Sequence, residues 1–331
     1  MLQVYPQLKV IDPCQGVDDI QKMVIRAPMS MDRSFQDDPL RLMRVLVRVA
    51  KDGYDMRLSD VIAMRRNVAL LDTISAERIR KELLGIMGGK HAAKALRLMY
   101  ASRVIDQIFP IFEENRVLDQ ENDHHSERAG RHMLSVACAV RDVTPLGRLA
   151  ALLHDAGKAR TKVVSQKADG RMRASFINHE DVGADLVQAR LTELRFPTSE
   201  IEYVCNIIRL HMRPPRIETA AAARRLSVAA GNTLQDLMAV CRADRACHPN
   251  EDMDKVDAQL AQVATWAAET TSMPIGEHAI ALSGHDLMQL GVKGKQIGVI
   301  KRALADEILE GTLSSDKQTL FARAQEMIRQ S

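Results

Sequence analysis

Six histidine and aspartate residues are spread over the middle of the chain, each in a stretch that otherwise reads as apolar helix: His132, His154, Asp155, His179, His211 and Asp244. Imidazole and carboxylate groups are ligands for divalent metals of intermediate hardness. A metal held by such ligands can activate water against a phosphate ester. We therefore expect several helices to build one buried metal site, and a metal-dependent phosphohydrolase is the first hypothesis.

The adjacent pair His154-Asp155 is the centre of this pattern, because both side chains can reach one cation from a helix end. His132 and Asp244 would complete a four-ligand site. The two remaining histidines are candidates for holding a second metal, bridged by Asp155, or a substrate phosphate. Any one of these histidines alone is more often a core or surface residue than a ligand. The ordered set in helical surroundings is the stronger signal.

Residues close to this set could support the same chemistry. Gly157 lacks a side chain, so it would leave room for metal and substrate to approach the backbone. Lys158 follows His154 by four residues, which in a continuous helix places both on one face, and its ammonium could neutralise a phosphoryl oxygen. Arg213 and Arg216 could bind substrate phosphates. The alternative for such basic residues is a solvated helix face with local salt bridges.

Helical patterning dominates the rest of the chain. Aromatic residues make up only 3% of it, and clusters of Val and Ile with period-two alternation are almost absent, so we expect an all-α protein. Apolar residues recur at three- and four-residue spacing after Asp38, up to a C-capping Gly53. Ser75 is expected to begin another helix that stops at Gly88. The first part, to about residue 33, has room for a strand or two, and residues 162–175 read as a mobile loop.

Bulk composition excludes several classes of protein. The formal net charge is +3, from 46 Lys and Arg against 43 Asp and Glu, which is too balanced to prove a nucleic-acid partner. The five cysteines form no CxxC pair and read as reduced thiols. No apolar run approaches the ~20 residues that span a bilayer. We therefore expect a soluble cytoplasmic protein with no membrane partner.

The ordered set resembles the HD superfamily of metal-dependent phosphohydrolases, whose pattern is His, then His-Asp, then Asp. The resemblance makes His132, His154, Asp155 and Asp244 the metal ligands. The stretches 176–184 and 211–214 narrow it to the HD domain of bacterial CCA-adding tRNA nucleotidyltransferases and related poly(A) polymerases. It implies divalent metal as the cofactor. Mn, Ni, Co, Fe, Zn and Mg all accept this ligand mix, so the identity of the metal stays open.

The resemblance extends beyond the HD domain. Residues 35–44 are similar to the neck motif Glu-Asp-x-x-Arg, which templates the incoming nucleotide. Asp37 replaces the glutamate of that motif, while Asp38 and Arg41 match it. Residues 282–288, with the glycines that follow, resemble the tail. The resemblance implies a remnant of the catalytic head at 1–33, a neck and body at 34–118, an HD domain at 119–252 and a helical tail at 253–331.

The resemblance also implies what this chain alone would not do. The head of the family contains a Gly-rich turn followed by an Asp-x-Asp pair that holds magnesium, and this sequence has no Gly-Gly turn followed by such a pair. We therefore expect no nucleotidyl transfer without another chain. The favoured activity is hydrolysis of a phosphoester, such as a 2′,3′-cyclic phosphate, a nucleotide, or a tRNA or RNA 3′ end. The alternatives are one subunit of a split tRNA nucleotidyltransferase with a separate head, and a non-catalytic RNA-binding remnant.

Overall fold

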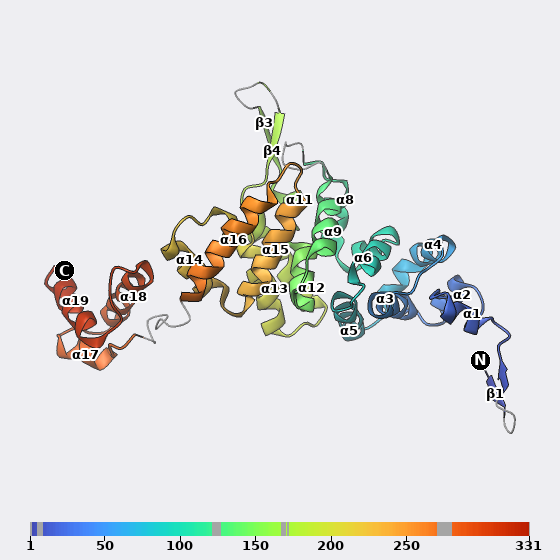
Figure 1. Ribbon diagram of the computed structural model, residues 1–331, viewed down its shortest axis with the longest axis horizontal. Coiled ribbons are helices and arrows are strands. Elements are labelled where there is room, and N and C mark those ends of the chain that lie inside the picture. The colour runs from blue at the N-terminus through green and yellow to red at the C-terminus, as the bar shows by residue number, and fades with distance from the viewer. Residues whose placement is uncertain are drawn as a thin grey trace. The chain divides into compact units, whose positions relative to one another are not determined.

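The computed structural model describes residues 2–4, 9–120, 127–166, 170, 172–269 and 280–330. Helices account for almost all of the regular structure, so the prediction of an all-α protein is confirmed (Figure 1). No described helix is both long enough and apolar enough to cross a membrane. The helices pack into two compact units, Met1–His211 with Gln235–Glu251, and Met212–Leu234 with Asp252–Ser331. The four-part division of the chain stays a prediction.

The first unit contains the predicted metal ligands. Its elements are β1 (Leu2–Val4), β2 (Lys9–Ile11), α1 (Gly16–Gln21), α2 (Met31–Asp37), α3 (Arg41–Asp52), α4 (Leu58–Asn67), a 3₁₀ helix (Val68–Thr73), α5 (Ala76–Met87), α6 (Ala92–Ala101), α7 (Val104–Ile108), α8 (Pro110–Val117), α9 (Ala129–Ala139), α10 (Pro145–Leu153), α11 (Lys158–Thr161), β3 (Val163–Gln166), β4 (Met172–Ser175), α12 (His179–Glu193), α13 (Thr198–Leu210) and nearly all of α15 (Leu234–Ala246).

The sequence signals for helices in this unit act as expected. In α3, the residues at three- and four-residue spacing, Leu42, Leu46 and Val49, are fully buried. Gly53 ends the helix with φ +82°, and its amide donates to the Val49 carbonyl at 3.0 Å. A left-handed backbone suits glycine because glycine has no Cβ to clash. The strands expected in the first part are present as the antiparallel pair β1–β2.

The prediction of a mobile loop at 162–175 is wrong. Strands β3 and β4 pair antiparallel, with Val163 opposite Ser175 and Gln166 opposite Met172, and the hairpin stands out from the helices of its unit (Figure 1). Gly170, with φ +80°, lies between the two strands. A composition rich in Lys, Arg, Gly and Ser reads as loop, but a two-stranded hairpin needs little burial to pair its backbones. Composition therefore misled the prediction.

Helix α10 is held by contacts in its N-terminal half, and the central His-Asp pair directly follows it. Thr144 is its N-cap, and the hydroxyl oxygen accepts from the Gly147 amide at 3.0 Å. The buried carboxylate of Asp236 accepts in turn from the Thr144 amide at 3.2 Å. Arg148 donates to the carbonyls of Met87 at 2.8 Å and Ala137 at 3.1 Å, which ties α10 to the ends of α5 and α9. These bonds anchor the helix that leads to His154.

The second unit is also helical. Its elements are a 3₁₀ helix (Pro214–Arg216), α14 (Ala220–Ala230), a 3₁₀ helix (Gly231–Thr233), α16 (Met253–Ala268), α17 (Gly284–Gln289), α18 (Lys295–Glu310) and α19 (Lys317–Gln330). Helix α17 begins with a reciprocal capping box, which Ser283 and Asp286 form. Leu282, Leu287, Leu304 and Leu320 are fully buried in the core of α17 to α19.

Candidate metal centre

The six predicted ligands come from five helices or helix ends of the first unit, and the structure brings them together. His132 lies in α9, the His154-Asp155 pair directly follows α10, His179 begins α12, His211 follows α13, and Asp244 lies in α15. All six are buried, with at most 9% of any residue exposed to solvent. Residues separated by 112 positions, His132 and Asp244, are in hydrogen-bond contact at 2.8 Å. The chain therefore folds to concentrate these groups in its interior.

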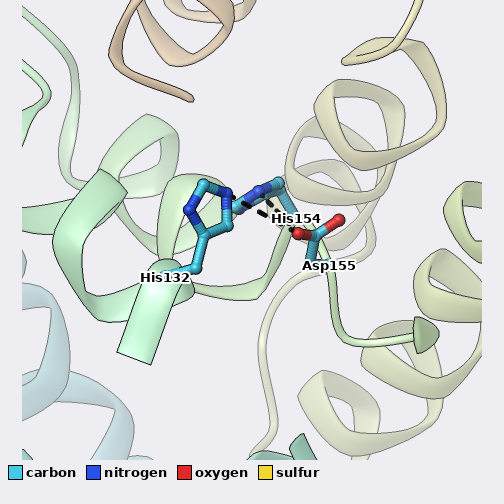
Figure 2. Close-up of side chains that lie close together, drawn as sticks. All are labelled: His132, His154 and Asp155. Atoms are coloured by element: carbon cyan, nitrogen blue, oxygen red, sulfur yellow. Dashed lines mark ion pairs between the residues drawn. The ribbon is translucent and has the colours of Figure 1, made fainter. Parts of the chain in front are cut away.

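One set of donors surrounds the carboxylates of Asp155 and Asp244. The Nε2 atom of His154 lies 3.2 Å from Asp155 Oδ2 and 3.6 Å from Asp244 Oδ1. His132 Nε2 lies 3.8 Å from Asp155 Oδ2. In Figure 2, dashed lines join the imidazoles of His132 and His154 to the Asp155 carboxylate. This is the predicted four-residue group, and its donor atoms converge on one place.

A second set of donors faces the other oxygen of Asp155. The Nε2 atoms of His179 and His211 lie 3.2 Å and 3.8 Å from Asp155 Oδ1, and 3.4 Å from each other. The two oxygens of one carboxylate thus point at two different groups of imidazoles. In a carboxylate, this arrangement is the one that can bridge two cations.

The histidine rings are oriented by backbone carbonyls three residues earlier in the chain. In His154, His179 and His211, the Nδ1 atom lies 2.9, 2.7 and 2.6 Å from the carbonyl oxygens of Ala151, Phe176 and Ile208. A carbonyl only accepts, so each Nδ1 carries the proton and donates it. In a neutral imidazole the lone pair is then on Nε2, which is the atom that faces the carboxylates. Metal-binding histidines are commonly fixed in this way.

The spacing of the donors fits a metal ion. Two donors bound to one ion at about 2.1 Å, as for nitrogen and oxygen on zinc, lie about 3.0–3.4 Å apart at angles of about 90–110°. The contacts between the imidazole nitrogens and the two carboxylates range from 2.8 to 3.8 Å. In addition, the buried Nε2 of His154 has no hydrogen-bond partner among the described residues. The residues present therefore suit divalent cations.

Protons and cationic side chains balance the charge of the buried carboxylates. Burial lowers the pKa of His154, but the carboxylates of Asp155 and Asp244 outweigh it and raise that pKa to about 10. Burial opposes ionisation of Asp155, yet the charges of His154 and Lys158 hold its pKa well below the usual range. Burial lowers the pKa of His211 to about 3, helped by the charge of His154. The carboxylates therefore stay ionised, and positively charged groups beside them stabilise that ionised form.

Lys158 supplies part of that positive charge. The prediction that Lys158 shares a helix face with His154 is wrong, because α10 ends at Leu153 and a new helix, α11, starts at Lys158 itself. The buried ammonium nevertheless reaches Asp155 Oδ2 at 2.7 Å and donates to Gln120 Oε1 at 2.8 Å. It is also 5.4 Å from the centre of the Phe176 ring. These contacts hold the Asp155 carboxylate in place. Its role as a phosphate binder stays a prediction.

Gly157 has a different role from the one expected. A Cβ there would overlap the carbonyl oxygen of His179 and lie 2.6 Å from the Gly183 amide nitrogen. The glycine therefore makes room for the backbone of α12, not for a metal or substrate. This close approach of the turn after Asp155 to the start of α12 is what brings His179 to Asp155.

Replacing Gly157 with alanine should destabilise the protein and displace His179. Because the new methyl group meets backbone atoms that cannot move aside alone, we expect a loss of about 1–3 kcal/mol in the free energy of unfolding. Gly85→Ala is the matched control. Gly85 lies inside α5, and a Cβ at this position would make only an ordinary contact with the Val47 side chain, at 3.6 Å. That control should be neutral or stabilising by up to about 1 kcal/mol. Chemical denaturation of both variants measures the difference, and equal stabilities would contradict this account of Gly157.

Sequence reasoning missed three residues around the centre. His248 Nε2 lies 3.5 Å from Asp244 Oδ1, and its position four residues after Asp244 was an available signal. Gln120 is 1% exposed and orients Lys158. Asn115 donates to the carbonyl of Ala156 at 3.0 Å and so fixes the turn after Asp155. No spacing rule points to Gln120 or Asn115, because their contacts depend on how α8 packs against this turn.

The other predicted binding residues are not among the six metal-ligand candidates. A pocket of about 690 Å³ near the N-terminal end of the first unit is lined in part by Asp37, Arg41 and Arg44. Asp38 faces Arg44 at 3.2 Å and Arg41 at 3.8 Å. Arg213 and Arg216 belong to the second unit, at the 3₁₀ helix Pro214–Arg216. Their roles in binding nucleotide or phosphate stay predictions.

Comparison with known proteins agrees with this geometry. The HD domain family matches residues 123–264, which include all six predicted ligands. A second family, described as "Probable RNA and SrmB- binding site of polymerase A", matches residues 61–115. Residues 123–264 are thus similar to HD domains, and most of the chain is similar to CCA-adding tRNA nucleotidyltransferases. The A-adding tRNA nucleotidyltransferase of Deinococcus radiodurans is 28% identical over 94% of this chain and 73% of that enzyme.

Further relatives extend the comparison. The CC-adding tRNA nucleotidyltransferase of Thermus thermophilus is 28% identical over 92% of this chain and 70% of that enzyme. Among solved structures, the CCA-adding enzyme of Bacillus stearothermophilus in complex with CTP is 21% identical, with a TM-score of 0.66 over 97% of this chain and 69% of that one. At this identity the structural likeness shows the fold alone: this chain has the helical fold of the corresponding part of that enzyme.

Proposed function

We propose that this protein is a metal-dependent phosphohydrolase with two metal positions that share Asp155. The observation that carries the proposal is the placement of two imidazole groups on the two oxygens of that one carboxylate. The first position would be held by His132, His154, Asp155 and Asp244, and the second by Asp155 with the remaining two histidines. Divalent metals bound there would supply the Lewis acidity that polarises a phosphoester and activates water. The identity of the metal, whether Mn, Ni, Co, Fe, Zn or Mg, is open.

The protein's own residues prepare the centre for this chemistry. Carbonyl acceptors fix the Nδ1 proton on three histidines, so Nε2 is the ring atom that would bind metal, after it releases any proton that it carries. The Lys158 ammonium holds one oxygen of Asp155 and offsets negative charge in a water-poor interior. Burial of all the ligands strengthens each of these electrostatic interactions.

The proposed substrate is a phosphoester of a nucleotide or of an RNA 3′ end, such as a 2′,3′-cyclic phosphate, and the proposed setting is tRNA processing. The relatives that match over more than nine-tenths of the chain are enzymes named for adding A or CC to tRNA. Residues 61–115 also match a family described as an RNA-binding site. Arg213 and Arg216 are proposed to bind substrate phosphate.

Hydrolysis of a substrate panel tests the proposal. The panel contains cyclic mononucleotides, RNA ending in a 2′,3′-cyclic phosphate, and p-nitrophenyl phosphoesters, each with the candidate metals in turn. We expect turnover of at least one phosphoester by the metal-loaded wild type, and its loss in Asp155→Ala. Equal activity of the two proteins, or no activity of either with any metal, would count against a hydrolase.

A second candidate function is one subunit of a split tRNA nucleotidyltransferase that binds tRNA and nucleotide. The observation that favours it is the pocket at the N-terminal end of the first unit, where Asp37 and Arg41 line a space large enough for a nucleotide. A separate head-like polypeptide would then supply the transfer chemistry. Incorporation of CTP or ATP into tRNA only when both chains are mixed is the expected result, and incorporation by neither mixture nor single chain argues against it.

A further inference from the structure

A seventh side chain lies among the six predicted ligands. His248 follows α15 in a turn, where its amide donates to the Arg245 carbonyl at 3.0 Å. The turn directs the imidazole back toward α15, so that its Nε2 lies 3.5 Å from Asp244 Oδ1. Its ring centre is 5.4 Å from the ring centre of His132. The side chain is 13% exposed, so most of it is removed from water.

Three imidazoles approach the same oxygen atom. Asp244 Oδ1 lies 2.8 Å from the Nε2 of His132, 3.6 Å from that of His154 and 3.5 Å from that of His248. One donor atom from each of His132, Asp244 and His248 falls within 4.8 Å of the others, which is a spacing that one cation can span. His248 therefore stands in the same geometric relation to Asp244 as a ligand already proposed, His154.

We infer that His248 is a fifth protein ligand of the first metal position, beside His132, His154, Asp155 and Asp244. This inference rests on the metal centre of the proposed function and adds a residue to it. A histidine that only positions a ligand commonly binds the part of that ligand turned away from the metal. His248 instead faces the one oxygen of Asp244 around which the other two imidazoles gather.

The consequence is that the two metal positions are unequal. The first would have five protein donors, whereas the second would have three, from Asp155, His179 and His211. Sites filled by protein ligands are closed and hold their metal for structure, whereas sites with few protein ligands keep positions open for water and substrate. The second position is therefore where the phosphoester binds, and the first should hold its ion more tightly.

X-ray absorption of the wild-type protein loaded with one equivalent of Co²⁺ tests the ligand set without any substitution. The inference predicts three imidazoles on that ion, and a centre without His248 predicts two. Calorimetric titration with Co²⁺ should then give two ions of different affinity. If wild type binds no metal at all, the proposed function fails. Two bound ions with two imidazoles on the tighter one overturn only the role of His248.

Substitution provides an independent measurement. His248→Gln, of similar size but a poor ligand, should weaken the tighter site by more than about 100-fold, because loss of an outer partner costs about 10–100-fold. His248→Asp restores a donor and should recover most of the affinity, which a packing role would not allow. His285→Gln, an exposed histidine of α17, is the control and should leave both sites unchanged. Wild-type affinity in His248→Gln, or no recovery in a folded His248→Asp, would overturn the inference.

Discussion

Replacing Asp155 with asparagine should abolish hydrolysis and reduce metal binding at both positions together. Asparagine keeps the size of the side chain but removes the charge that faces His154 and Lys158 on one oxygen and His179 on the other. Lewis-acid catalysis by a bound metal contributes several kcal/mol to the barrier. Since about 1.4 kcal/mol corresponds to a factor of ten, loss of about 4 kcal/mol lowers the rate by about 1,000-fold.

The matched control for this prediction is Asp142→Asn. Asp142 is exposed and has φ +52°, a conformation that asparagine also tolerates, so the same chemical change occurs away from the centre. The rate of hydrolysis and the metal content of purified Asp142→Asn should equal those of wild type. Steady-state kinetics and elemental analysis of both variants make the comparison. Loss of one metal with the other retained at full affinity would show that Asp155 does not bridge.

Divalent metal should raise the thermal stability of the first unit by a large amount. The charge of two buried, ionised carboxylates is partly balanced by a proton on His154, and a bound divalent cation would displace that proton and contact both carboxylates. A ligand at 100 times its Kd stabilises by about 2.7 kcal/mol. For a unit of this size each kcal/mol shifts the Tm by about 2–4 °C, so Mn²⁺ should raise it by about 5–10 °C.

Variants and chelation test whether this shift belongs to the centre. In Asp244→Asn, which loses the carboxylate that contacts His132 at 2.8 Å, the added Mn²⁺ should raise the Tm by much less. A chelator should reverse the shift in wild type. Differential scanning calorimetry measures each case. A shift of the same size in Asp244→Asn would mean that Mn²⁺ binds elsewhere on the chain.

Much of the architecture could be predicted from local pattern. Apolar residues at three- and four-residue spacing, a glycine stop at Gly53 and a helix start at Ser75 are signals that lie within one or two turns of helix, and the structure contains the corresponding elements. The six metal-ligand candidates were found by residue type, and the fold places them side by side. Residue type was enough because burying a His or Asp side chain without a polar partner costs free energy, so such residues tend to be buried together.

The rest depended on packing and on helix ends that the local pattern did not predict. Gly157 was expected to face a metal, but the backbone of α12 lies against it. The sequence around Gly157 does not predict that contact. Lys158 reached Asp155 from a new helix, although a continuous helix was assumed. The β3–β4 hairpin was missed because its strands are short and lie in a stretch rich in Lys, Arg, Gly and Ser.

Anomalous diffraction from crystals soaked in Mn²⁺ tests the central claim most directly. We predict two peaks, one beside each oxygen of Asp155, about 3.5–4 Å apart as in other two-metal sites. The peak near Oδ2 should lie among His132, His154 and Asp244, and the other should lie between His179 and His211. A map with no peak at Asp155, while Mn²⁺ binds elsewhere in the crystal, would contradict the account.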